Sequence, residues 1–176
     1  MLHLVRHGRP LTDAVSPAHT WPLDPDGYAA IETLRTSGRL PGTATWFSSP
    51  ERKARETAAR LTDEPVAVVD DLAEHRREAR WFATAEEFRD VVRAAFARPD
   101  VPAVPEWEPL SDTRERVVGA VHRLRAAHPG DLVLVGHGTA WTVLVAALTG
   151  APPDLDAWAR LAMPDLWVVE DMPPVE

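Results

Sequence analysis

Short apolar runs alternate along the chain with longer segments whose apolar residues recur every three or four positions. The short runs are rich in branched and aromatic side chains, which predicts buried strands. The longer segments, with one apolar face each, predict helices packed against those strands. The predicted strands cover residues 2–5, 44–48, 66–69 and 132–136, with an edge strand over residues 166–169.

Helix signals at the ends of the longer segments support this division. Ser49 and Ser111 are predicted N-caps, and Thr84 with Glu87 three positions later forms a capping-box pattern. Gly150 is a predicted stop signal. The predicted helices cover residues 26–37, 49–61, 84–97, 111–127 and 139–148.

Alternating strands and helices predict an α/β fold, a three-layer α/β/α sandwich with a largely parallel central sheet. The length of 176 residues suits one domain spanning residues 1–176. Prolines in segments 11–23 and 100–109 predict irregular loops, and the polar segment 70–80 predicts another connection. The tail from Asp171 is expected to be loose.

The composition narrows the possible functions. No apolar stretch approaches the roughly 20 residues that span a bilayer, so a membrane protein is not expected. A formal net charge of −8 argues against a sequence-independent nucleic-acid binder. The chain has no cysteine, which excludes a disulfide, a thiolate metal site and a cysteine nucleophile. Because the first residues lack the basic and apolar segments of a signal peptide, we expect a cytoplasmic location.

Two histidine–glycine pairs close two of the predicted strands. Arg6-His7-Gly8 follows the first strand, and His137-Gly138 follows the fourth. In a parallel sheet, side chains at the carboxyl ends of strands converge on one crevice. Two imidazoles and an arginine at one point are suited to an anion. The sequence therefore predicts a site that handles a phosphoryl group.

Four segments together resemble the histidine phosphatase superfamily, which includes cofactor-dependent phosphoglycerate mutases and many small phosphomonoesterases. Residues 4–8 look like the nucleophile motif of that family, and residues 135–138 look like its second-histidine motif. Residues 48–58 look like its second phosphate-binding segment, and residues 72–74 look like the segment that bears the acid. The order and rough spacing hold over residues 2–148, which implies a phosphoglycerate mutase-like fold.

The resemblance implies roles for two catalytic residues. His7 would attack phosphorus and form a phosphohistidine. Glu74 would protonate the leaving alkoxide and then take a proton from the attacking water. Glu78, four residues later, is an alternative acid. The helix that begins near Thr139 would point its free N–H groups at the same anion.

The resemblance also implies a set of phosphate-binding residues. Arg6, Lys53 and His137 would hold the phosphoryl group, with His137 protonated beside it, and Gly138 would leave room for close approach. Lys53, the only lysine in the chain, stands where the family carries an arginine. The adjacent Arg52 is the alternative cation, because it lies about 100° around the predicted helix.

The leading hypothesis is a metal-independent phosphatase acting on a small phosphorylated metabolite or a phosphoprotein. No metal-ligand spacing is evident, so we expect neither a metal nor a cofactor. A non-catalytic protein that binds phosphate ligands is one alternative, because Lys53, Pro10 and Asp13 depart from the family pattern. A phosphomutase is less favoured, since mutases of the family are longer. The sequence makes no prediction of oligomeric state.

The remaining histidines have no assigned chemistry. His3 shares a face of the first strand with Val5 and is expected to pack in the core. The others are expected at the surface or in loops; they are His19, His75, His122 and His128.

Overall fold

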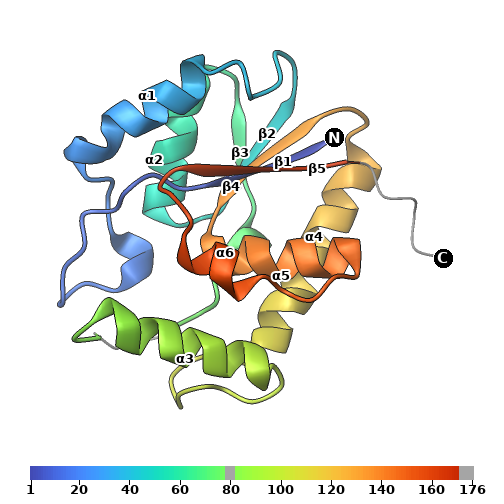
Figure 1. The fold of residues 1–176 in the computed structure, drawn as a ribbon. Helices are drawn as coiled ribbons and strands as arrows, with labels where there is room; N and C mark the ends of the chain where they lie inside the picture. Colours follow the sequence, from blue (N-terminus) through green and yellow to red (C-terminus); the bar gives the residue numbers. More distant parts are fainter. Residues whose placement is uncertain (78–81, 171–176) are drawn as a thin grey trace.

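A five-stranded sheet forms the centre of the protein (Figure 1). The structure is a computed structural model that describes residues 1–77 and 82–170. The strand order is β3-β2-β4-β1-β5, in which the first four strands in sequence are parallel and β5 is an antiparallel edge. The strands are β1 (Leu2–Arg6), β2 (Thr45–Ser48), β3 (Val66–Val68), β4 (Leu132–Gly136) and β5 (Asp165–Val169). The predicted α/β fold with a largely parallel sheet is confirmed.

Helices cover both faces of the sheet. The α-helices are α1 (Tyr28–Thr36), α2 (Arg52–Leu61), α3 (Ala85–Ala97), α4 (Leu110–Ala127), α5 (Gly138–Thr149) and α6 (Leu155–Ala159). Single 3-10 turns occur at η1 (Ala18–Thr20), η2 (Pro25–Gly27) and η3 (Asp70–Leu72). Helix α6, which is only five residues long, was not predicted from the sequence.

Alternate residues of β1 belong to two different cores, as the period of two in a strand requires. Leu2 and Leu4 pack in the core that contains residues of α4 and α5. Val5 packs in the core that contains residues of α1 and α2. His3, on the same face as Val5, is only 4% exposed, which confirms its expected burial. The sheet is thus covered on both faces, and its carboxyl edge is left to form a site.

Two of the predicted helix caps are confirmed. The Thr84 side chain accepts a hydrogen bond from the N–H of Glu87 at 3.1 Å, as a capping residue does. Gly150 ends α5 with a positive φ of 69°, a left-handed conformation that glycine adopts without the steric cost of a Cβ.

The two predicted serine caps are wrong. Helix α2 begins at Arg52, two residues later than the Ser49 cap would place its start, and its N-cap residue is Glu51. The Ser49 hydroxyl accepts the N–H of Glu51 at 3.3 Å ahead of the helix and also bonds to His137. Helix α4 begins at Leu110, and Ser111 lies inside its first turn with its N–H donating to the carbonyl of Pro99.

The first turn of the helix predicted over residues 26–37 is the 3-10 turn η2, with the Asp24 side chain accepting the N–H of Asp26. The tail from Asp171 lies outside the described residues. No helix in the described part of the chain is both long and apolar enough to cross a bilayer. The cytoplasmic location stays a prediction.

Candidate active site

The carboxyl ends of the parallel strands bring the predicted site together. The register pairs Arg6 with Gly136 and Ser48 with Val135, so the residues that follow β1, β2 and β4 are neighbours. The N–H of His7 donates to Gly136, and that of Ser49 donates to Val135. These residues border a cavity of about 810 Å³. The cavity is lined by all six residues of the predicted site, namely Arg6, His7, Lys53, Glu74, His137 and Gly138.

His7 is held with one ring nitrogen committed to the backbone. Its Nδ1 lies 2.7 Å from the carbonyl oxygen of Gly8, which only accepts, so Nδ1 carries the proton and Nε2 keeps its lone pair. Burial, His137 and Lys53 together lower the pKa of His7 well below its usual value. The ring is therefore neutral at pH 7. The N–H of Gly8 donates to the Thr57 hydroxyl at 2.9 Å, which ties this loop to α2.

His137 is completely buried next to His7. The two ring centroids are 5.2 Å apart in an edge-on arrangement. The His137 Nε2 lies 2.7 Å from the Ser49 hydroxyl. Burial lowers the pKa of His137 to about 4 despite the opposing effect of Glu51. The ring is thus neutral in the free protein at pH 7, and its protonation beside a bound phosphoryl group stays a prediction.

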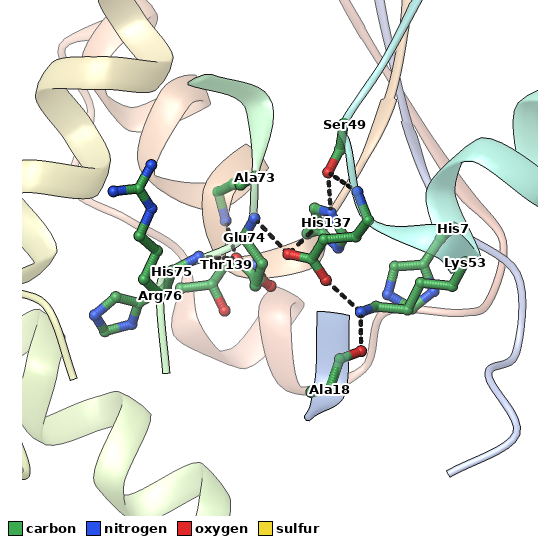
Figure 2. Close-up of polar contacts among 12 residues, drawn as sticks. His7, Ala18, Ser49, Lys53, Ala73, Glu74, His75, Arg76, His137 and Thr139 are labelled. Carbon is green, nitrogen blue, oxygen red and sulfur yellow. Dashed lines mark hydrogen bonds and ion pairs between the residues drawn. The ribbon is translucent and has the colours of Figure 1, made fainter. Parts of the chain in front are cut away.

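The structure distinguishes the two candidate cations of α2. The Lys53 side chain is only 7% exposed, and its ammonium donates to the carbonyl of Ala18 at 2.8 Å and pairs with Glu51 (Figure 2). The Arg52 side chain is 57% exposed and pairs with Glu56. Lys53 therefore faces the cavity, and Arg52 faces away from it.

Glu74 lies at the N-terminus of α5. Its carboxylate accepts the N–H of Ala140 and of His75, both at 2.9 Å, and the N–H of Thr139 at 3.2 Å. Burial raises the pKa of Glu74, but Arg77 and His137 lower it by more, so the pKa lies below its usual value. The helix N–H groups that were expected to face the anion are thus taken by this carboxylate.

The loop that carries Glu74 is anchored by a residue that the sequence analysis missed. The Arg116 guanidinium donates to the carbonyl oxygens of Ala73 and Glu74, both at 2.6 Å, and to that of Asp71 at 3.1 Å. It also pairs with the Glu108 carboxylate at 2.6 Å. Charge-assisted bonds to three carbonyl oxygens of the Glu74 loop leave it little freedom. The alternative acid, Glu78, lies outside the described residues.

Arg6 and Gly138 fit closely against each other. One terminal nitrogen of Arg6 donates to the carbonyl oxygens of Leu161 and Ala162, at 2.7 and 3.2 Å. A Cβ at position 138 would lie 3.3 Å from the Arg6 Nε and 3.1 Å from the Leu161 side chain. Glycine at this position therefore leaves room for the guanidinium at the cavity wall. The Arg6 Nε is buried without a hydrogen-bond partner in the described part of the chain.

Arg77 is a further cation of the cavity that the sequence analysis missed. Its guanidinium lies 4.8 Å from the Phe88 ring and 4.7 Å from the Trp107 ring, and it donates to the Thr139 hydroxyl at 2.8 Å. The run of charged residues around it gave no sign of this placement, because such runs usually lie on a solvated face. The two aromatic rings explain how the side chain is held.

Glu51 is a carboxylate inside the cavity, and it too was missed. Its Oε1 accepts the N–H of Glu74 at 2.9 Å and lies 3.5 Å from His137 Nε2. Its Oε2 pairs with Lys53. Burial raises the pKa of this carboxyl, but His137 and Lys53 lower it by far more, so Glu51 is ionised at neutral pH.

The structure also places Asp13, Pro10 and His75. The Asp13 carboxylate accepts hydrogen bonds from Val15 and Ser16 of its own turn and does not line the cavity. Pro10 does line it. His75 lies in a loop but is buried rather than exposed, because its ring bonds to the Glu108 carbonyl and contacts Trp107. Within residues 1–77 and 82–170, no group of three or more histidine or carboxylate side chains could hold a metal ion.

Comparison with known proteins identifies the family. Residues 2–169 match the sequence model of the histidine phosphatase superfamily, branch 1, and the chain belongs to that family. No curated protein matches the chain. The fold is phosphoglycerate mutase-like, as that of similar solved structures is.

Three solved structures illustrate the similarity. YhfR of Bacillus stearothermophilus is 25% identical with a TM-score of 0.68, and the match covers 87% of this chain and 81% of YhfR. A mycobacterial glucosyl-3-phosphoglycerate phosphatase is 26% identical with a TM-score of 0.66, over 92% and 84% of the two chains. A protein of Thermus thermophilus, TTHB049, is 28% identical with a TM-score of 0.64, over 86% and 85%. The mycobacterial enzyme has also been solved with VO3 and with inorganic phosphate. These relationships support phosphatase activity in general.

Proposed function

We propose that the protein hydrolyses a phosphomonoester through a phosphohistidine on His7. The observation that carries the proposal is the hydrogen bond from His7 Nδ1 to the Gly8 carbonyl, which leaves the lone pair on Nε2 of a neutral ring in a residue that lines the cavity. A neutral imidazole with a fixed tautomer is a competent nucleophile for phosphorus.

The reaction has two steps on this geometry. In the first, His7 Nε2 bonds to phosphorus as the ester P–O bond breaks, and protonated Glu74 gives its proton to the departing alkoxide. In the second, Glu74 takes a proton from water while the oxygen of that water attacks phosphorus and the P–N bond breaks. Inorganic phosphate leaves, and His7 and Glu74 return to their starting states. In-line transfer of this kind depends mainly on positioning and on stabilising the equatorial oxygens.

Cations around the cavity supply that stabilisation. Arg6, Lys53 and His137 hold the phosphoryl group, and the planar fork of Arg6 suits two of its oxygens. We propose that no metal takes part. The substrate is a small phosphorylated metabolite or a phosphoprotein. Sugar-linked phosphoglycerates belong in the substrate screen, because a similar mycobacterial protein is a glucosyl-3-phosphoglycerate phosphatase.

The test is turnover of a chromogenic phosphate ester in EDTA, by wild type and by His7→Ala. We expect turnover in the wild type, a trapped phosphohistidine after rapid acid-free quenching, and neither in the variant. His122→Ala is the matched control, because His122 is an exposed histidine on α4 outside the cavity. Absence of hydrolysis of every ester between pH 5 and 8 would refute the proposal.

A non-catalytic binding protein is the second candidate, and the ion pair between Glu51 and Lys53 favours it. Such a protein would keep Arg6, His7 and His137 as an anion cradle without turnover. Calorimetric binding of phosphate compounds without hydrolysis would support it, and a trapped phosphohistidine would eliminate it. A phosphomutase differs in the fate of the phosphoryl group, which would pass to a second acceptor and not to water.

A further inference from the structure

A carboxylate stands where the site is expected to receive an anion. The Glu51 side chain is 9% exposed and lines the same cavity as His7 and His137. It is the N-cap residue of α2, but its side chain makes no capping bond and reaches into the cavity. A buried charge is costly unless it is paired and hydrogen-bonded, so the partners of Glu51 show what it does.

Glu51 occupies donors that a phosphoryl group would use. One carboxylate oxygen pairs with Lys53, the cation of the second phosphate-binding segment. The other accepts the N–H of Glu74 at 2.9 Å and lies 3.5 Å from His137 Nε2 (Figure 2 shows the labelled Lys53, Glu74 and His137 around this point). Two donors, the Lys53 ammonium and the Glu74 N–H, are thus directed at one carboxylate beside His137, in the way they would be directed at phosphoryl oxygens.

We propose that Glu51 is an internal anion that fills part of the phosphoryl subsite in the free protein and sets its affinity for oxyanions. A phosphoryl group reaches Lys53 only when the Glu51 side chain turns out of the subsite. Inorganic phosphate, the product, meets the same competition, so Glu51 weakens product binding and speeds its release. The inference rests on the proposed function only in taking this cavity as the phosphoryl site.

The test measures oxyanion affinity by calorimetry with inorganic phosphate and with vanadate as probes. The proteins are wild type, Glu51→Gln and Asp70→Asn. Glutamine keeps an acceptor for the Glu74 N–H and removes the charge. Asp70 also lines the cavity, but its side chain is exposed and forms no ion pair within the described residues. Asp70→Asn therefore removes an equal charge from the cavity wall without freeing Lys53.

The expected result is a rise in oxyanion affinity in one variant only. A charge-assisted bond that no longer has to be broken corresponds to about 10- to 100-fold tighter binding for Glu51→Gln. Loss of an exposed, screened charge at Asp70 should change affinity by less than about fivefold. Glu51→Ala, which introduces no new donor, should show the same rise, and it replaces Glu51→Gln if that variant fails to fold.

Two outcomes would overturn the inference. One is unchanged or weaker oxyanion binding in both Glu51 variants, which would make Glu51 a permanent partner of Lys53. The other is a rise no larger than that of Asp70→Asn, which would indicate general electrostatics. Neither depends on turnover, so the proposed function is tested separately by the His7 experiment. Tighter oxyanion binding in the Glu51 variants without hydrolysis by the wild type would support this inference and reject the phosphatase. Hydrolysis by the wild type with unchanged binding in the variants would support the phosphatase and reject this inference.

Discussion

The Ser49 hydroxyl lies 2.7 Å from Nε2 of His137, and both side chains are fully buried. The two residues follow β2 and β4, which are adjacent parallel strands, so the register of the sheet fixes the contact. This bond holds the plane of the imidazole where His137 borders the cavity.

Replacing Ser49 by alanine should therefore disturb His137 more than it disturbs the fold. Loss of one buried hydrogen bond should lower kcat/KM on a phosphate ester by about tenfold. Ser48→Ala is the matched control, since that hydroxyl is equally buried but bonds to the carbonyl of Ser49. Steady-state kinetics and thermal unfolding of both variants check this. Equal losses of activity in the two would mean that the effect is structural.

Arg116 should act on catalysis through the position of Glu74. Arg116→Gln removes bonds to the backbone of the Glu74 loop and leaves the Glu108 carboxylate without its cation. We expect a larger loss for esters with alkoxide leaving groups than for nitrophenyl phosphate, because only the former need a well-placed acid. Arg123→Gln is the control: Arg123 bonds to the Asp71 side chain on the same loop but is 66% exposed. An equal loss on both esters would indicate simple destabilisation.

The sequence was sufficient to predict the convergence of His7 and His137. This prediction needed only two short apolar runs that end in histidine and glycine, together with the rule that side chains at the carboxyl ends of parallel strands converge. Adjacent residues lie about 100° apart around a helix, so Lys53 and Arg52 were expected on different sides of α2. The buried Lys53 and the exposed Arg52 agree with that expectation.

The contacts inside the cavity could not be predicted in this way. A glutamate at the start of a helix, such as Glu51, is ordinary on local grounds, because carboxylates favour helix N-termini. Its place in the cavity depends on Lys53, Glu74 and His137, which come from three separate segments. Arg116 lies in the middle of a helix and bonds mainly to carbonyl oxygens, which leave no pattern in the sequence.

Glu74→Gln tests the acid directly. The amide can accept the N–H groups of α5 but cannot give up a proton in the same way, so the fold should persist while protonation of the leaving group is lost. Hydrolysis of alkyl phosphates should fall about 100- to 10,000-fold, and hydrolysis of nitrophenyl phosphate should fall far less. Equal losses on both substrates would point to Glu78 as the acid or to a structural role for Glu74, and thermal unfolding of the variant distinguishes the two.

Lys53 should stabilise the transition state of hydrolysis, and Arg52 should not. Lys53→Ala removes a buried cation, which should cost about 10- to 100-fold in kcat/KM. Lys53→Arg should retain or raise activity, because a guanidinium can bind two phosphoryl oxygens. Arg52→Ala is the control on the adjacent, outward-facing residue. Acylation read by mass spectrometry gives a second measurement: vanadate should protect Lys53, the only lysine, and should leave the N-terminal amine reactive.

The pH dependence should differ between the two kinds of ester. The pKa of His7 is lowered well below its usual value of 6.5, so His7 has already lost its proton when the pH reaches 6.5. The increase in rate that accompanies this deprotonation therefore lies at a pH below 6.5. The pKa of Glu74 is also lowered, so in the free protein its protonated fraction falls about tenfold for each pH unit above that pKa. For alkyl phosphates, kcat/KM should therefore be highest on the acidic side of neutral and should decline towards pH 9. Nitrophenyl phosphate, which needs little proton donation, should decline less. Dividing the rate for an alkyl phosphate by the rate for nitrophenyl phosphate removes the dependence on His7, which both esters share. A ratio that stays constant between pH 5 and 9 would show that Glu74 is not the acid.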